Sequence, residues 1–457
     1  MLVLGPPRSG KTSCVIVPSI LSAPGPVVST STKPDVMDRT AYPRARAGEV
    51  MLFDPTGTVE RPAHVAPLRW SPISACSDWS EATLVARLMV SASGTSSTGN
   101  QRHLDDHWHE RAQSLIATLL HAASLEAAPM STVLRWVDRR EADHALNVLY
   151  ESGSELPTDL LEGIATTDER ERSGIWSTAS GVLSAYRSDA ALATTKGENF
   201  DARDFADGLG TIYICASGRR QDLASPLVVA LLSEIRTARY EKAALGVNGG
   251  PPMLFALDEA ANIAPLADLG QQLSEGGGQG LLTLVSLQDM SQARSRWGPG
   301  ADGWLSLFGA KLVLPGIEDL RTLEMLSTLS GQEEIVTRSV SAPVSTGTDR
   351  ARTMLARLGG RGRYFGSPPA HNVTSSTIWR PRLSVDEISR GHDRMALLVD
   401  ERTEMGWVRM TPSFEQPWLS IGGGHDRVAG LGAARRDPGL DRQAGRGPAG
   451  IGLGRNP

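Results

Sequence analysis

The 457-residue sequence has few cysteines, few lysines and no long apolar run. Its longest apolar stretches, such as residues 281–285, are far shorter than the roughly 20 residues that a transmembrane helix needs, so no membrane span is predicted. The first residues carry no basic segment of the kind that opens a signal peptide. Cys14, Cys76 and Cys215 lie far apart without metal-ligand spacing, which favours reduced thiols in the core over disulfides or a metal site.

Positive charge is also limited, and arginine carries almost all of it. Lys and Arg number 46 against 51 Asp and Glu, which gives a formal net charge of −5. This balance excludes the basic coat expected of a protein that binds nucleic acid over its whole surface, although local basic loops stay possible. The length allows two or three domains, and 40% hydrophobic with 21% charged residues is typical of a globular protein.

The residue pattern changes twice along the chain. Short apolar runs between glycine and proline turns predict strands at the start, joined by one helix at about residues 11–21. From about residue 77 to 205, apolar residues recur at three- and four-residue spacing, which predicts a block of helices. Strands then return, with a long helix at about residues 223–244 between two of them. The predicted strands lie at residues 2–4, 27–30, 50–53, 210–215, 253–257, 281–287, 311–314, 395–399 and 407–410.

This order predicts an α/β sheet that an all-α insert interrupts. We expect a first part of the core at residues 1–76, the insert at 77–205 and the second part of the core at 206–420. Residues 341–376 mix Gly, Ser, Thr and Arg without periodicity and are expected to form a long loop. Residues 421–457 are rich in glycine with an excess of arginine, and we expect them to be a disordered tail.

The strongest chemical signal is a phosphate-binding loop between the first strand and the first helix. The motif G-x-x-x-x-G-K-[ST] needs glycines where successive backbone N–H groups surround a phosphate, and the helix N-terminus adds partial positive charge. Lysine then reaches the β- and γ-phosphates, and the hydroxyl of the last residue binds Mg²⁺. The predicted nucleotide-binding residues are Gly5, Pro6, Pro7, Arg8, Ser9, Gly10, Lys11 and Thr12.

Two further strand ends carry groups that suit nucleotide hydrolysis. The apolar run 254–257 leads into Asp258, which we expect to hold Mg²⁺, and Glu259, which we expect to be the general base for the attacking water. The next strand ends at Gln288, an amide that can donate to a γ-phosphate and accept from water, as a sensor of hydrolysis would. The predicted catalytic residues are therefore Glu259, Lys11 and Gln288, with Thr12 and Asp258 at the metal.

With these residues placed, the chain resembles the TraG/TraD-type coupling proteins of type IV secretion, the ring ATPases that feed conjugative DNA and proteins into the channel. The resemblance runs from about residue 2 to 418, and its most discriminating feature is the helical stretch of about 250 residues between the two Walker elements. It rests on the Walker A loop 5–12, Ser31-Thr32-Lys33-Pro34-Asp35, Phe53-Asp54-Pro55, Trp70-Ser71-Pro72-Ile73, Trp108 with Ala112 and Leu115, Leu257-Asp258-Glu259, Ser286-Leu287-Gln288 with Gln292 and Trp297-Gly298, and Arg380-Pro381-Arg382-Leu383 with Asp386-Glu387-Ile388.

The resemblance implies a RecA-like P-loop ATPase core with an inserted all-α domain that faces the substrate side of a ring. It implies ATP and Mg²⁺ as cofactors, a homo-hexamer, and single-stranded DNA or a relaxosome together with type IV secretion channel components as partners. Relatives usually carry two transmembrane helices before the Walker loop, so a separate membrane-anchor protein is expected to hold this chain at the cytoplasmic face of the plasma membrane.

A second departure concerns the arginine that ring ATPases place across the subunit interface. Where many relatives have an arginine before the sensor strand, this chain reads Gly276-Gly277-Gly278-Gln279-Gly280. Arg294, Arg296 and Arg321 are the alternatives that remain. Two other functions also stay open: a FtsK/HerA-like duplex DNA translocase, and a receptor for secretion substrates that binds nucleotide without hydrolysing it.

One histidine cluster raises the question of a metal site. His103, His107 and His109 lie among acidic residues, and an i, i+4 histidine pair can bind zinc on one helical face. No third ligand follows at a recognisable spacing, so a solvated polar helix start is favoured.

Overall fold

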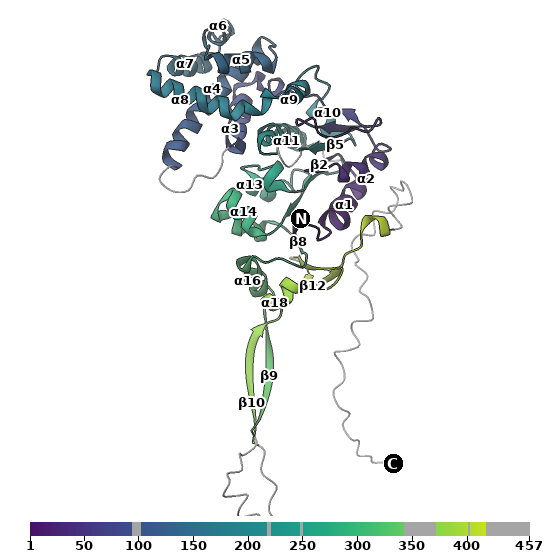
Figure 1. The fold of residues 1–457 in the computed structure, drawn as a ribbon. Helices are drawn as coiled ribbons and strands as arrows, with labels where there is room; N and C mark the ends of the chain where they lie inside the picture. Colours follow the sequence, from purple (N-terminus) through teal and green to yellow (C-terminus); the bar gives the residue numbers. More distant parts are fainter. Residues whose placement is uncertain (94–101, 217–220, 247–249, 342–371, 401–402, 417–457) are drawn as a thin grey trace, which may run out of the picture.

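The structure is a computed structural model that describes residues 1–93, 102–216, 221–246, 250–341, 372–400 and 403–416. A block of helices lies at one end, a two-stranded ribbon projects from the opposite end, and a twisted sheet with its covering helices lies between them (Figure 1). Within the described residues no helix is both long and apolar enough to cross a membrane.

The centre of the fold is a ten-stranded sheet with the order β12-β11-β8-β1-β7-β6-β2-β5-β3-β4. Neighbouring strands from β8 through to β4 are parallel, whereas β11 pairs antiparallel with β8 and β12. The parallel strands therefore end at one common edge, which we call the carboxyl edge, and begin at the opposite amino edge. The strands are β1 (Leu2–Leu4), β2 (Val27–Ser31), β3 (Val50–Phe53), β4 (Ala66–Pro67), β5 (Thr211–Cys215), β6 (Met253–Leu257), β7 (Leu281–Leu287), β8 (Ala310–Val313), β11 (Met395–Asp400) and β12 (Thr403–Arg409).

The predicted α/β class is confirmed, and each predicted strand corresponds to an observed one. Strands such as β1, β2 and β6 are buried along their whole length, as expected for parallel strands covered on both faces. The prediction of a single helix in the first part was wrong. The helix expected at 11–21 is a π-helical turn, η1 (Thr12–Ile16), continued by α1 (Val17–Ser22), and α2 (Asp35–Arg44) is a second helix. The buried face of α2 includes the polar Thr40 and Arg44, which hides its apolar period.

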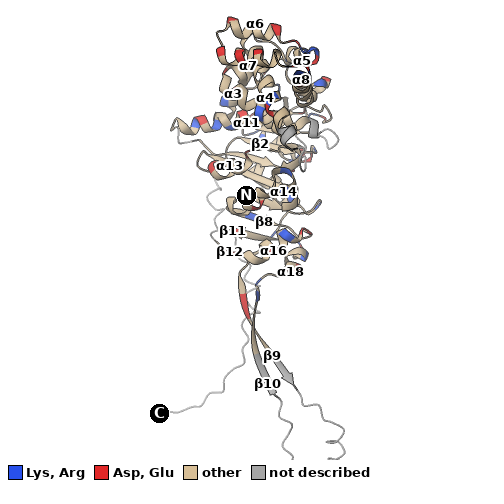
Figure 2. Cartoon of the chain, turned by 90° about the vertical axis from the view of Figure 1, so that its left-hand side faces the viewer, with Lys and Arg blue, Asp and Glu red and all other residues tan. Residues whose placement is uncertain are grey.

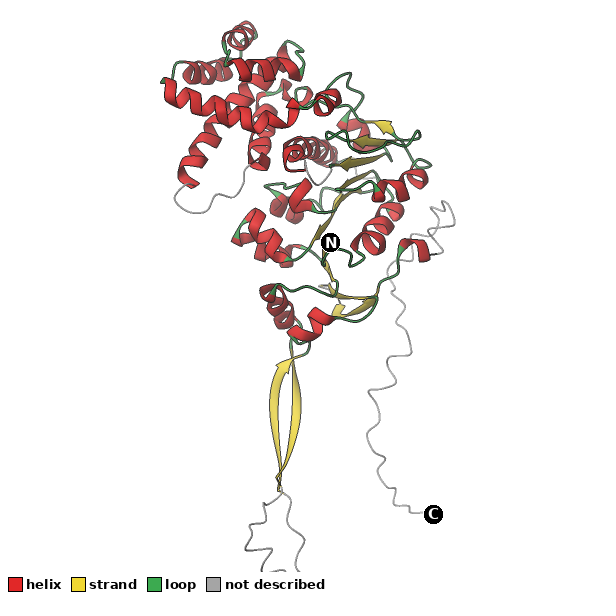
Figure 3. Cartoon of the chain, viewed as in Figure 1, coloured by secondary structure: helices red, strands yellow, loops and turns green. Residues whose placement is uncertain are grey.

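Helices fill the chain between β4 and β5, where the described residues include no strand. Helix α3 packs against α11, the long helix that covers one face of the sheet, so the helical block and the sheet share one apolar core (Figure 3). The boundaries at residues 77 and 205 stay a prediction. The helices of the block are α3 (Trp79–Ser93), α4 (Arg102–Leu125), α5 (Met130–Arg139), α6 (Asp143–Glu151), α7 (Glu155–Ala165), α8 (Glu169–Val182), α9 (Asp189–Thr194) and α10 (Ala202–Asp207), with the 3-10 turns η2 (Ser74–Ser77) and η3 (Leu183–Arg187).

Shorter helices surround the second half of the sheet. Both acidic and basic residues are visible on the helical block and the core, with no basic coat over the whole surface (Figure 2). Cys76 and Cys215 are buried and Cys14 is half-buried, and all three are free thiols. The remaining helices are α11 (Gln221–Ala244), α12 (Ala260–Ile263), α13 (Leu269–Glu275), α14 (Met290–Trp297), η4 (Pro299–Gly303), α15 (Trp304–Leu307), α16 (Leu320–Leu329), α18 (Val385–Arg390) and η5 (Ser413–Glu415).

The expected long loop at residues 341–376 is corrected at both of its ends. Strands β9 (Gln332–Ser341) and β10 (Asn372–Pro381) pair antiparallel along ten residues each and form the projecting ribbon. Serine and threonine dominate this part of β10, and their weak apolar alternation explains why no strand was predicted there. Residues 342–371 and the tail at 421–457 lie outside the described residues.

Candidate functional site

The loop after β1 begins with two glycines whose backbone no other residue would fit easily. The Gly5 N–H donates to the carbonyls of Leu287 (3.2 Å) and Gln288 (3.0 Å), which ties the loop to the end of β7. A Cβ on Gly5 would lie 2.8 Å from the Ser9 hydroxyl, and Gly10 has a φ of +94°, which favours glycine. Pro6 accepts from the Ser9 N–H, while Pro7 and Arg8 are exposed at the outer turn. The loop therefore has the backbone that a phosphate cradle requires.

Lys11 folds back over this loop. Its ammonium donates to the carbonyls of Gly5 and Pro6, the latter at 3.0 Å. Burial lowers the pKa of Lys11, and the nearby carboxylates of Asp258 and Glu259 oppose that shift. A phosphate bound in the loop would replace the two carbonyls as the partner of a cation that is already desolvated.

Thr12 and Asp258 bring the two Walker elements into contact. The Thr12 hydroxyl donates to Oδ2 of Asp258 at 3.2 Å across 246 residues of sequence. Asp258 is 7% exposed, and burial raises the pKa of its carboxyl, while Lys11 and Thr12 act in the opposite direction. A hydroxyl and a carboxylate oxygen are hard ligands that fit Mg²⁺, which takes few protein ligands and completes its shell with phosphates and water. Accordingly, the described residues contain no cluster of three metal-ligating side chains that would bind a metal without a nucleotide.

Glu259 has an unusual backbone for a residue with a side chain. Its φ of +52° and ψ of +45° place it in the left-handed region at the start of α12, which costs of order 1–3 kcal/mol for such a residue. Its carbonyl accepts the N–H groups of Asn262 (2.9 Å) and Ile263 (3.2 Å) and so begins that helix. Strain of this kind is concentrated at functional sites, where the surroundings hold a side chain in a required direction.

Gln288 lies at the same edge, beside the loop. It follows β7, the strand that pairs with β1, and its carbonyl accepts the Gly5 N–H. The residue is exposed, and its N–H donates to Oε1 of Gln292 at 3.0 Å. The structure therefore places Lys11, Thr12 and Asp258 in one contact group and Glu259 and Gln288 on adjacent strand ends.

Sequence reasoning missed Thr30, which belongs to this edge. Its buried hydroxyl donates to the backbone carbonyl of Asp258 at 3.1 Å. Strand β2 is the neighbour of β6 in the sheet although 228 residues separate the two partners. The strand order of RecA-like cores was the only signal that could have brought them together.

The three candidate arginines are engaged within the chain. Arg294 forms ion pairs with Asp302 (3.1 Å) and Asp319 (2.6 Å), and Arg321 also pairs with Asp302. Arg296 donates to the carbonyl of Ala92 at 2.9 Å. None of these contacts identifies a trans-acting arginine.

The histidine cluster at the start of α4 does not form a metal site among the described side chains. His107 is half exposed and lies 3.7 Å from Glu171, and the neighbouring Trp108 packs against Gly174. The side chain of His103 lies outside the described residues.

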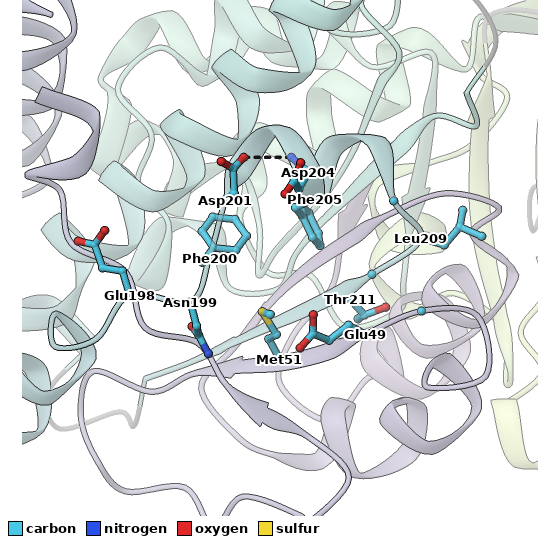
Figure 4. Close-up of a pocket in the computed structure, with 13 residues that line it drawn as sticks. Glu49, Met51, Glu198, Asn199, Phe200, Asp201, Asp204, Phe205, Leu209 and Thr211 are labelled. Carbon is cyan, nitrogen blue, oxygen red and sulfur yellow. Dashed lines mark hydrogen bonds between the residues drawn. The ribbon is translucent and has the colours of Figure 1, made fainter. Parts of the chain in front are cut away.

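A cavity of about 470 Å³ lies at the amino edge, away from the phosphate loop. Its lining comes from the residues just before β3 and β5 and from the start of α10, and it combines acidic side chains with Phe200 and Phe205 (Figure 4). Asp201 caps α10 by accepting from the N–H of Asp204 at 3.0 Å. The predicted residues of the nucleotide site all lie at the other edge.

Comparisons with known proteins agree with this arrangement. The family model described as "Type IV secretory system Conjugative DNA transfer" matches residues 1–356. Two Escherichia coli proteins named Conjugal transfer protein TraG are 24% and 26% identical over 426 and 420 residues, and VirD4 of Rhizobium rhizogenes is 20% identical over 347 residues. The alignments cover 85% of this chain for TraG and 74% for VirD4. The chain spans 61% of the length of the TraG relatives and 50% of VirD4.

Solved structures with a similar fold are those of the bacterial conjugative coupling protein TrwBdeltaN70. The sulphate-bound trigonal form has a TM-score of 0.64 at 17% identity and covers 90% of this chain and 84% of that one. The complex of TrwB with ADP and Mg²⁺ has a TM-score of 0.56 at 17% identity and covers 86% of each chain. These matches show that the two proteins share a fold.

Proposed function

Because the chain belongs to the type IV secretory system conjugative DNA transfer family, we propose that it binds ATP and Mg²⁺ and hydrolyses the ATP to move conjugative DNA into a secretion channel. The observation that carries the proposal is the contact between Thr12 and Asp258 beside the Lys11 ammonium. It joins the phosphate loop to a strand-end carboxylate, the pairing that P-loop nucleotide hydrolysis requires.

In this mechanism each residue of the carboxyl edge has one task. Lys11 and the loop N–H groups bind the β- and γ-phosphates, while Thr12 and Asp258 hold the metal. Bound Mg²⁺ neutralises charge that develops on the phosphate oxygens. Glu259 accepts a proton from the attacking water, and Gln288 at the neighbouring strand end contacts the γ-phosphate and reports its loss.

The solved relatives support nucleotide binding as part of this proposal. TrwB has been solved with ADP and Mg²⁺ and with non-hydrolysable analogues of GTP and ATP. We extend nucleotide binding to this chain because Gly5, Gly10 and Lys11 give it the required loop.

Partners and assembly follow from the same family membership. We propose single-stranded DNA or a relaxosome as the substrate, type IV secretion channel components as the receivers, and a homo-hexameric ring as the active form. The chain would act peripherally at the cytoplasmic face of the membrane, held there by a separate anchor protein. The names of the relatives, which refer to conjugal transfer and coupling, support this setting.

The test is an ATPase assay with and without single-stranded DNA, run beside a mass measurement of the oligomer. We expect DNA-stimulated turnover. Glu259→Gln should lower the rate by about 10²–10⁴-fold and keep nucleotide binding, because only proton transfer is removed. Lys11→Ala should lose nucleotide binding itself, as measured by fluorescent ATP titration. An oligomeric wild-type protein that hydrolyses no ATP under either condition would refute the motor.

One observation favours the alternative of a non-hydrolysing receptor. Arg294 and Arg321 are committed to ion pairs and Arg296 to a backbone carbonyl, so none of the three is free for a neighbouring nucleotide. A receptor of this kind would bind ATP and change its oligomeric state without turnover. The same assay separates the two functions. The duplex DNA translocase gains no support, because the matching family is one of conjugative transfer.

A further inference from the structure

We propose that Thr30 is a positioning residue that directs the Glu259 side chain by holding the peptide group between Asp258 and Glu259. This inference rests on the proposed function, since it concerns the base of the proposed hydrolysis. Thr30 is fully buried, so its hydroxyl does not reach a nucleotide or the attacking water and acts only through its partner.

The bond is set by the strand order. Thr30 lies opposite Leu257 in the parallel pair of β2 and β6, one residue before the point where β6 ends. From there its hydroxyl donates to the carbonyl of Asp258 at 3.1 Å. A side chain on the neighbouring strand therefore holds the first carbonyl after β6.

The chain turns sharply at this point. The Asp258 N–H donates to the carbonyl of Ala256 at 3.2 Å, which ends the regular ladder of the strand. One residue later, the carbonyl of Glu259 accepts two N–H groups of α12. Both peptide groups that flank Glu259 are thus fixed, one by Thr30 and one by the helix.

This double attachment explains how Glu259 keeps a left-handed backbone. A residue with a φ of +52° can relax by rotation of the preceding peptide group, which changes ψ of Asp258 and φ of Glu259 together. That rotation would carry the Asp258 carbonyl away from the Thr30 hydroxyl and leave a buried acceptor unbonded. The hydroxyl thereby selects the peptide orientation in which the Glu259 side chain leaves β6 toward the phosphate loop.

The experiment compares Thr30→Val, which keeps the shape and removes the hydroxyl, with Thr30→Ser, which keeps the hydroxyl. Both are made in the full chain and assayed for kcat, KM for ATP and nucleotide Kd. We expect Thr30→Val to lower kcat about tenfold, as loss of one buried hydrogen bond allows, with Kd within about twofold of wild type. Thr30→Ser should restore kcat to within about threefold of wild type.

A matched control is Thr118→Val in α4. Thr118 is also fully buried and donates to a backbone carbonyl, that of Leu115 at 2.8 Å, but it lies in the helical block. It should match Thr30→Val in lost stability and leave kcat unchanged. If Thr30→Val does not fold, Thr30→Ala takes its place under the same criteria.

The outcomes separate this inference from the function on which it rests. Wild-type turnover with an unchanged kcat in Thr30→Val overturns the role of Thr30 alone. An equal loss of kcat in Thr118→Val, or a loss of nucleotide affinity parallel to kcat, also overturns it, because either result indicates a general structural effect. A wild-type protein without any turnover overturns both the positioning role and the proposed hydrolysis.

Discussion

The two edges of the same sheet treat buried polar groups in opposite ways. At the amino edge, the buried Arg44 guanidinium donates to the Thr211 hydroxyl and to the carbonyls of Ala23, Gly25 and Leu209, at 2.8–3.1 Å. At the carboxyl edge, the buried Asp258 has an upward-shifted pKa, and the backbone of Arg8 and Glu259 is left-handed. One edge satisfies its polar groups for stability. The other keeps unfavourable conformations and desolvated charges that a nucleotide and its metal would stabilise.

The largest expected effect breaks the well-bonded edge. Arg44→Met should lower the free energy of unfolding by about 3–5 kcal/mol, because several buried carbonyls lose their donor at once. The nucleotide affinity of the folded fraction should stay unchanged, since the substitution lies at the opposite edge. Urea unfolding and nucleotide titration measure the two quantities.

The control for this prediction is on the same helix end. Arg46 is exposed and lies over the ring of Tyr42, so Arg46→Met should change stability by less than about 0.5 kcal/mol. Equal losses for the two variants would show that the buried bonds of Arg44 contribute little.

A smaller and pH-dependent effect is expected beside the amino edge. Glu234 accepts from the indole N–H of Trp70 at 2.6 Å, and burial raises its pKa to about 7, with Glu198 and Asp201 adding to the shift. Because the folded state disfavours ionisation, wild-type stability should fall as the pH rises from the ordinary carboxyl pKa of about 4.3 through 7. Glu234→Gln does not ionise and keeps the acceptor, so at pH 8 it should be more stable than wild type by up to about 3 kcal/mol.

The same comparison at pH 5 should show most of that gain removed. Glu241→Gln on the same helix is the control, since Glu241 is half exposed and pairs with Arg203. A gain for Glu234→Gln that does not depend on pH would contradict the assigned ionisation.

The smallest expected effect relieves strain at the carboxyl edge. Glycine at position 259 removes about 1–2 kcal/mol of left-handed strain and adds unfolded-state entropy worth about 0.4–1 kcal/mol, so Glu259→Gly should stabilise the fold by roughly 0.5–1 kcal/mol. ATP hydrolysis should be lost. Thermal unfolding against Glu259→Ala, which keeps the strain, is the measurement, and equal stability of the two variants would show that this backbone is not strained.

The sequence could predict the elements whose signal is local. The alternation of apolar runs and turns predicts the strands, and the motif at residues 5–12 predicts the loop because glycine spacing and a following helix are local properties. Asp258, Glu259 and Gln288 were accessible in the same way, since each follows an apolar run. Their placement at one edge agrees with the prediction, and their chemical roles stay proposals.

What could not be predicted depends on contacts between distant segments. The bond from Thr30 to Asp258 exists only because β2 lies beside β6. The same holds for α2, whose Arg44 is buried by carbonyls from other loops, and for the β9–β10 ribbon, whose pairing replaces an apolar pattern. In each case a tertiary hydrogen bond, rather than hydrophobic periodicity, stabilises the element.

The packing of α3 on α11 also limits how force can pass through the molecule. The apolar core is continuous from the sheet residues Phe255 and Leu257, through Val228 and Leu231 of α11, to Leu88 of α3. A displacement of β6 on nucleotide turnover would therefore reach the helical block by direct steric contact, without a hinge or linker between them. The α3–α11 contact would act as a lever arm, and its stiffness would set how far each hydrolysis event moves the block.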